Sequence, residues 1–141
     1  MSTITTSRFK RLLGTWNTSG KIITKEGNME LRGTDSYEWI LDGNFILHKA
    51  HVMMGDEKGE THEIIIPDSI PDTAQMQYFN SKGEHGIMRG ELTENTFIIR
   101  GEGIIFEGII NEDDTQITGH WYLQSEHDTR ELFIELKLEK R

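Results

Sequence analysis

After Gly14 the sequence consists largely of short runs rich in β-branched and aromatic residues. Gly, Asn and Asp interrupt these runs about every eight to twelve residues, which is the spacing of strands joined by short turns. No amphipathic helical segment separates the runs, which argues against a parallel sheet because such sheets need helical crossovers. The pattern therefore predicts an all-β protein of consecutive antiparallel strands.

About ten runs can be delimited in this way. They cover residues 15–24, 29–41, 44–54, 61–66, 74–80, 84–92, 96–101, 103–110, 116–124 and 131–139. A long open sheet would leave exposed edges, whereas an up-and-down barrel closed on itself has none. The length of 141 residues suits one domain, and no stretch has the composition of a linker. We therefore expect a single antiparallel barrel over residues 1–141.

Two local signals refine this prediction. Thr6 or Ser7 is suited to cap a short N-terminal helix, and Gly14 is suited to end it. The apolar side of that helix would consist of Phe9, Leu12 and Leu13. The dipeptide Asp42-Gly43 predicts a two-residue hairpin turn, because Asp and Gly tolerate the positive φ that a type I′ turn requires.

The composition excludes several classes of function. With 24 acidic and 15 basic residues the formal charge is −9, so the average field repels nucleic acid and anionic lipid, and neither is expected as a partner. The absence of Cys excludes disulfides, thiolate metal sites and a cysteine nucleophile. Because no signal peptide or membrane-spanning apolar run is evident, the default location is the cytoplasm.

The alternation of side chains gives a provisional list of inward-facing residues, since residues two apart share a face. In the second run Asp35, Tyr37, Trp39 and Leu41 share the inner face, and in the third the inner set includes Ile46, His48 and Ala50. Among the later inward residues are Met76, Tyr78, Met88, Phe106, Ile117 and Trp121, and finally Leu132, Ile134, Leu136 and Leu138.

The triplet Gly14-Thr15-Trp16 resembles the G-x-W motif that opens lipocalin-like, or calycin, barrels. A longer pattern supports the resemblance: GTDSYEWILDGNFILHKAHVMMG at 33–55, YFNSKGEHG at 78–86 and ITGHWYL at 117–123. In order and spacing these segments are similar to a bacterial domain-of-unknown-function family with a lipocalin-like barrel. The resemblance implies that fold and a general expectation of small-molecule binding, without a catalytic residue set.

The same resemblance implies a role for Trp16. In lipocalin-like barrels the motif Trp packs across one end of the barrel, often against a basic residue from a late strand, for which Arg130 and Lys137 are the candidates. The nitrobindins, a related family that carries haem, begin with a similar triplet. This chain has Asn17-Thr18-Ser19 where a glycine-rich and acidic continuation would be expected, so no haem or other cofactor is predicted.

Two of the histidines are candidates for a metal ligand or a catalytic group. His48 and His51 lie three apart on one predicted strand and therefore point to opposite faces, so no metal site is predicted there. Glu38 and His48 lie at nearly opposed positions of one hairpin and would make an acid/base pair if both faced a cavity. The alternation places Glu38 outside and His48 inside, which favours a surface role for Glu38.

The sequence therefore predicts a protein that binds a small hydrophobic or amphipathic molecule. The ligand-binding residues would be Tyr37, Trp39, His48, Met76, Tyr78, Met88 and Trp121, because long Met and amphipathic aromatic side chains suit a cavity wall. One alternative is an isomerase or hydrolase of the same fold with His48 as the base. Another is a filled barrel that acts as a homodimeric scaffold, with Phe45, Leu47 and Met53 as its outer contact face.

Overall fold

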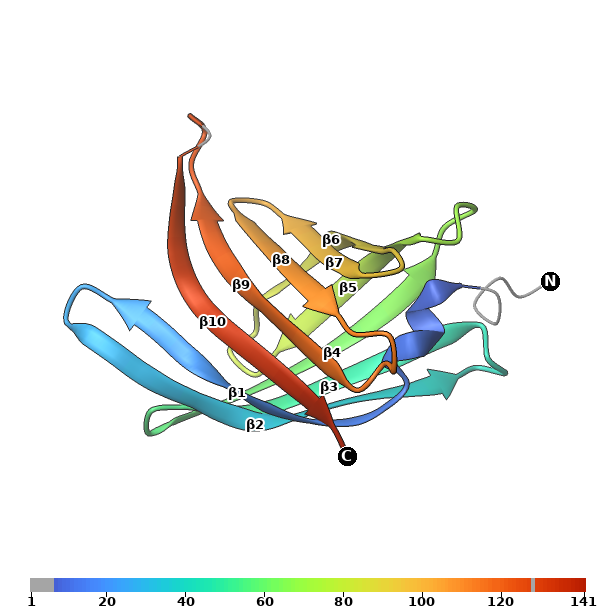
Figure 1. Cartoon of the computed structure of the whole chain (residues 1–141), viewed down its shortest axis with the longest axis horizontal. Coiled ribbons are helices and arrows are strands. Elements are labelled where there is room, and N and C mark those ends of the chain that lie inside the picture. The colour runs from blue at the N-terminus through green and yellow to red at the C-terminus, as the bar shows by residue number, and fades with distance from the viewer. Residues whose placement is uncertain (1–6, 128) are drawn as a thin grey trace.

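The computed structural model of this chain describes residues 7–127 and 129–141. Ten antiparallel strands close into an up-and-down barrel, which confirms the predicted fold class (Figure 1). The strands are β1 (Gly14–Thr24), β2 (Gly27–Ile40), β3 (Phe45–Met54), β4 (Glu57–Pro67), β5 (Thr73–Asn80), β6 (His85–Leu92), β7 (Thr96–Gly101), β8 (Ile104–Ile110), β9 (Gln116–Gln124) and β10 (Arg130–Lys140).

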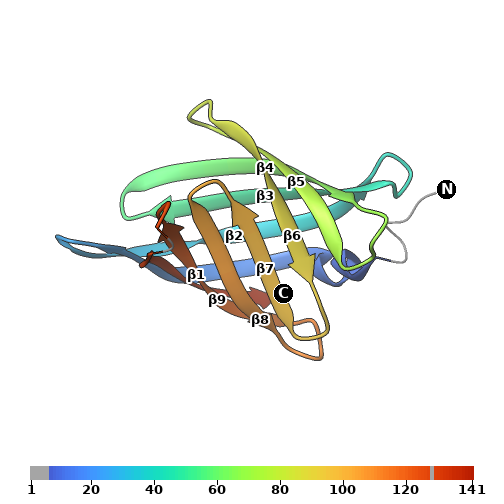
Figure 2. The ribbon, with the colours of Figure 1, turned by 90° about the horizontal axis from the view of Figure 1, so that it is seen from above.

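Every strand pairs with its neighbours in sequence, and the pairing of β1 with β10 closes the barrel. This last pairing joins the first and last strands of the chain, from Trp16 opposite Lys140 to Ile22 opposite Ile134. Seen from above, the strands curve around a common interior (Figure 2). No helix in the described part of the chain is long and apolar enough to cross a membrane.

The largest boundary difference lies at the start of β4. Residues 57–60 lie outside the predicted runs, but they extend β4 and pair with the end of β3, from Met54 opposite Glu57 to His51 opposite Glu60. Gly55 adopts φ 64° and forms the short turn with Asp56. Antiparallel pairing tolerates polar residues on a solvated face, so this polar stretch stays in the hairpin.

The turn between β2 and β3 also differs from the expectation. Instead of a two-residue Asp42-Gly43 turn, residues 41–44 form the connection. Positive φ angles occur at Leu41 (51°), Asp42 (61°) and Gly43 (77°). The amide nitrogen of the Asn44 side chain donates to the Leu41 carbonyl over 2.8 Å, which stabilises the longer turn.

A short 3-10 helix, η2 (Arg8–Leu12), covers one end of the barrel (Figure 1). Ser7 is its N-cap, because its Oγ accepts from the Phe9 amide at 3.1 Å, while the other predicted cap, Thr6, lies outside the described residues. Leu13 is the C-cap, and Gly14 begins β1 with φ 126° rather than ending a helix.

Trp16 closes the barrel beneath this helix, as the resemblance implied. Its side chain is fully buried, and Nε1 donates to the Leu12 carbonyl over 2.8 Å. The basic partner is Lys140, whose Nζ lies 4.8 Å from the centre of the Trp16 ring. Arg130 and Lys137, the expected candidates, pair instead with Glu107 and Glu139. Lys140 was missed because only the β1–β10 register places it opposite Trp16.

The inner face follows the predicted alternation in most strands. The last strand departs from it, because the register shifts between Leu132 and Ile134. Ile134 pairs with the inward Trp121, whereas Leu132 pairs with Tyr122. Ile134, Leu136 and Leu138 line the interior, but Leu132 does not. A bulge changes which residues share a face, so simple alternation fails at that point.

Candidate functional site

The interior of the barrel holds a cavity of about 380 Å³. This volume lies within the usual range for small-molecule sites. Asn80 ends β5 and Ile104 begins β8, and both line the cavity, so it reaches the end of the barrel opposite η2. The lining comprises Asp35, Tyr37, His48, Ala50, Thr61, Glu63, Met76, Tyr78, Asn80, Met88, Phe97, Ile99, Ile104, Phe106, Ile117, Trp121, Ile134, Leu136 and Leu138.

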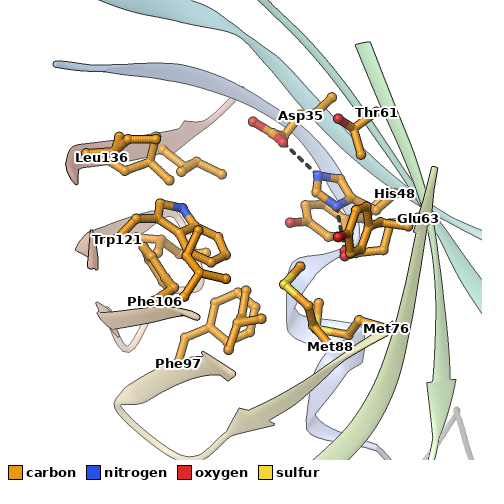
Figure 3. A pocket seen from close by; sticks show the side chains of 18 of the residues that line it. Asp35, His48, Thr61, Glu63, Met76, Met88, Phe97, Phe106, Trp121 and Leu136 are labelled. Carbon is orange, nitrogen blue, oxygen red and sulfur yellow. Dashed lines mark hydrogen bonds and ion pairs between the residues drawn. The ribbon is translucent and has the colours of Figure 1, made fainter. Parts of the chain in front are cut away.

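One wall of the cavity carries a chain of buried polar groups from three adjacent strands (Figure 3). His48 of β3 lies between Asp35 of β2 and Glu63 of β4. Its Nε2 donates to Asp35 Oδ1 over 2.6 Å, and its Nδ1 donates to Glu63 Oε1 over 3.0 Å. Asp35 and Glu63 are 8% and 5% exposed. This arrangement, here called the polar wall, consists of Asp35, His48 and Glu63.

The geometry of the polar wall fixes the charge of the imidazole. Each ring nitrogen faces a carboxylate, which accepts hydrogen bonds but donates none, so both nitrogens carry a proton. Burial by itself lowers the pKa of His48, but the hydrogen bonds to Asp35 and Glu63 outweigh it and raise that pKa to about 10. His48 is therefore an imidazolium at neutral pH.

Tyr37 and Thr18 support the polar wall from either side of the Asp35–His48 pair. The ring of Tyr37 stacks on the imidazole with centroids 4.1 Å apart and planes 7° apart. Burial raises the pKa of Tyr37 well above its usual value, and the negative charges of Asp35 and Glu63 add to the effect, so the phenol stays protonated. Thr18 Oγ1 donates to the second oxygen of Asp35. Burial raises the pKa of Asp35, but its bonds to His48 and Thr18 lower it on balance.

The opposite side of the cavity is apolar (Figure 3). Phe106 packs at its centre, with ring centroids 5.8 Å from Phe97 and 5.2 Å from Trp121. The Phe106 ring lies directly over Gly108 and Gly119, where an added Cβ would come within 2.7 Å of it. We call Phe97, Phe106 and Trp121 the apolar wall.

The predicted ligand-binding residues separate into two groups. Six of them line the cavity: Tyr37, His48, Met76, Tyr78, Met88 and Trp121. Trp39, the seventh, is 38% exposed and does not line the cavity, so its predicted place in the cavity wall requires correction. Its position opposite the buried Ile46 keeps it on the inner side of the sheet, but beyond the cavity. It lies one residue from the end of β2, where its ring sits beside Gly43 of the following turn.

Sequence reasoning missed the partners of His48. Asp35 was placed on the inner face without a role, and Glu63 was not considered. The signal for Glu63 was the Gly55-Asp56 dipeptide, a hairpin signal whose register puts Glu63 directly opposite His48. Glu38, the carboxylate that was weighed as a partner, lies outside as the alternation indicated and is 3.8 Å from Lys49 Nζ.

One group of potential metal ligands lies on the outer surface. The ligand atoms of His51, Glu60 and His62 are all within 4.8 Å of one another, and a set of two His and one Glu is known from zinc sites. In the structure a carboxylate oxygen of Glu60 lies 3.7 Å from a ring nitrogen of His51, and the other lies 3.2 Å from a ring nitrogen of His62. His48 and His51 do not share a site, because His51 points outward.

Comparisons with known proteins identify the fold alone. No family model matches the sequence, and no curated protein matches it. Solved structures that are similar over the whole chain include the crystal structure of Rv2717c from M. tuberculosis, with 9% identity, a TM-score of 0.73 and 98% of that chain covered. They also include the S-type phycobiliprotein lyase CPES from Guillardia theta, with 13% identity, a TM-score of 0.63 and 93% of that chain covered. The chain thus shares the fold of these structures and forms a closed, ten-strand antiparallel barrel.

Proposed function

We propose that this protein binds a small, amphipathic molecule inside its barrel. The observation that carries the proposal is the cavity of about 380 Å³, which has a charged, hydrogen-bonded wall on one side and aromatic rings on the other. Small-molecule sites are mostly apolar with a few precisely placed polar groups, and this cavity has that composition. The similarity to a phycobiliprotein lyase adds support at the level of fold only.

The state of His48 disfavours the enzymatic alternative. A general base must accept a proton near the working pH. His48 has both ring nitrogens protonated and a pKa raised to about 10 by Asp35 and Glu63, against the effect of its burial. An isomerase or hydrolase with His48 as the base therefore has little support from the site.

The scaffold alternative is disfavoured by the interior. A barrel that served only as a scaffold would be expected to fill its interior at the density of other protein cores. The outer residues suggested for a homodimer do not form a uniformly exposed patch, because Phe45 and Leu47 are half-buried and only Met53 is exposed.

A fluorescent apolar probe tests the proposal. N-phenyl-1-naphthylamine should bind in one saturable site, quench tryptophan emission and raise the melting temperature, because it binds the folded state preferentially. Trp121→Ala should weaken this binding at least tenfold. Trp39→Ala is the matched control, since it removes the same side chain from outside the cavity, and it should leave the affinity within about twofold. Absence of saturable binding to the wild type, or equal losses in both variants, would overturn the proposal.

A further inference from the structure

We infer that the ligand of this cavity carries a cationic nitrogen or a strong N–H donor at one end, so that the barrel selects apolar amines over carboxylates such as fatty acids. The inference rests on the proposed binding function and deepens it.

The cavity wall has an excess of negative charge. Among the described residues that line it, only Asp35, His48 and Glu63 have ionisable acidic or basic side chains, apart from the two tyrosines. Two carboxylates and one imidazolium leave one uncompensated negative charge. Because these groups are buried, solvent screens them much less than it screens surface charges. A ligand carboxylate placed here would meet like charge, whereas an ammonium group would balance it.

The positive group of the wall is not available to a ligand. Both N–H groups of His48 already donate to Asp35 and Glu63, and one face of its ring is covered by Tyr37. Asp35 is also engaged at both oxygens, since Thr18 donates to the second one. An anionic ligand would therefore find no free cationic donor among the described lining residues.

Glu63 supplies the free acceptor. Its Oε1 accepts from His48, and the described residues include no hydrogen-bond donor to its Oε2. No buried side-chain oxygen or nitrogen among the described residues lacks a partner, so Oε2 is not sealed inside the protein and its accessible surface faces the cavity that Glu63 lines. A carboxylate oxygen in this position accepts a short, charge-assisted bond from an ammonium or N–H donor.

The apolar wall indicates the chemistry of the part of the ligand that lies away from its nitrogen. Phe97, Phe106 and Trp121 lie across the cavity from Glu63 (Figure 3). A molecule that places its nitrogen at Glu63 therefore extends its hydrocarbon or aromatic part toward these rings. The two walls together require an amphipathic molecule with the polar group at one end.

Three probes with one skeleton and different end groups test the inference. They are 2-(aminomethyl)naphthalene, 2-(hydroxymethyl)naphthalene and 2-naphthoate, titrated into the full chain by calorimetry at pH 7.5 and 150 mM salt. The amine should bind at least tenfold more tightly than the alcohol, and the carboxylate at least tenfold more weakly. This comparison uses only wild-type protein, so it does not depend on whether a variant folds.

A matched pair of variants separates the local effect from the overall charge of −9. Glu63→Gln keeps the shape and the acceptor for His48 but removes the negative charge, so the preference for the amine over the alcohol should fall at least tenfold. Glu60→Gln makes the same change in net charge on the outer face of the same strand, and the preference should stay within about twofold.

The outcomes distinguish the two proposals. If the three probes bind with equal affinity, or the carboxylate binds best, the inference about the ligand is overturned while the binding function stands. If Glu60→Gln reduces the preference as much as Glu63→Gln, the selectivity comes from net charge and the inference about Glu63 is also overturned. If none of the probes and no apolar dye binds, both proposals fail.

Discussion

The two walls of the cavity are held in place by different forces. The polar wall on β2, β3 and β4 depends on hydrogen bonds between buried charges, and each member is needed to compensate the others. The apolar wall on β7, β8 and β9 depends on the packing of Phe97, Phe106 and Trp121. The stability that the polar wall contributes should therefore change with pH and with the loss of a single charge, whereas that of the apolar wall should change only with side-chain volume.

The largest expected loss of unfolding free energy follows a substitution in the polar wall. His48→Gln removes the only cation between Asp35 and Glu63 and leaves two carboxylates close together in a buried site. Breaking a buried ionic arrangement in this way costs about 3–5 kcal/mol of unfolding free energy. Urea unfolding at pH 6.5 measures the loss. His62→Gln, on the exposed face of β4, should cost less than about 1 kcal/mol. Similar values for the two variants would contradict the role assigned to His48.

The next largest loss of unfolding free energy is expected for a substitution in the apolar wall. Phe106→Ala should lower the unfolding free energy by about 3 kcal/mol, the low end of the range for a buried Phe. Part of its ring faces the cavity and therefore has fewer protein contacts to lose. Urea unfolding at two pH values provides the measurement, and the loss should be the same at both. A loss that changed strongly with pH would show that the two walls are coupled.

The pH dependence of the wild-type unfolding free energy distinguishes the walls, because only the polar wall contains a group, His48, that titrates between pH 6.5 and 10. The folded-state pKa of His48 is about 10 and its unfolded value is 6.5, so the stabilisation is fully present below pH 6.5 and is lost as the pH rises toward 10. Within this window one proton is released on unfolding, and stability falls by about 1.4 kcal/mol per pH unit, or about 2 kcal/mol between pH 6.5 and 8.

His48→Gln should remove this slope, since the titrating group is gone, while Phe106→Ala should retain it. Equilibrium unfolding at half-unit pH steps for the three proteins provides the comparison. A wild-type stability that is flat from pH 6.5 to 9 would be inconsistent with an imidazolium held between Asp35 and Glu63.

The smallest expected effect is at Trp39, which belongs to neither wall. Because its side chain is 38% exposed beside a turn, Trp39→Ala should change the unfolding free energy by less than about 1.5 kcal/mol, well below the cost for a buried aromatic. Thermal unfolding followed by circular dichroism is sufficient to measure this. A loss comparable to that of Phe106→Ala would mean that Trp39 packs into the barrel after all.

The sequence alone determined the strands and most of the inner face. The ten β-rich runs correspond to the ten strands, and the alternation placed Tyr37, His48 and Trp121 inward, because the side-chain period of a strand is a local property of the backbone. Alternation failed where a local irregularity intervened, at the bulge before Ile134. At Trp39 the alternation held opposite the buried Ile46, but it gave no information on how far the cavity extends along the strand.

Which residues meet depends on how the strands pair and could not be read from the sequence. The partners of His48 come from the strands on either side of β3, and Lys140 reaches Trp16 only through the pairing that closes the barrel. These contacts depend on register, which in turn depends on exact turn positions such as Gly55-Asp56. The charge of His48 likewise follows from its two carboxylate neighbours and its burial, so it is a property of the assembled sheet and cannot be read from the strand that carries it.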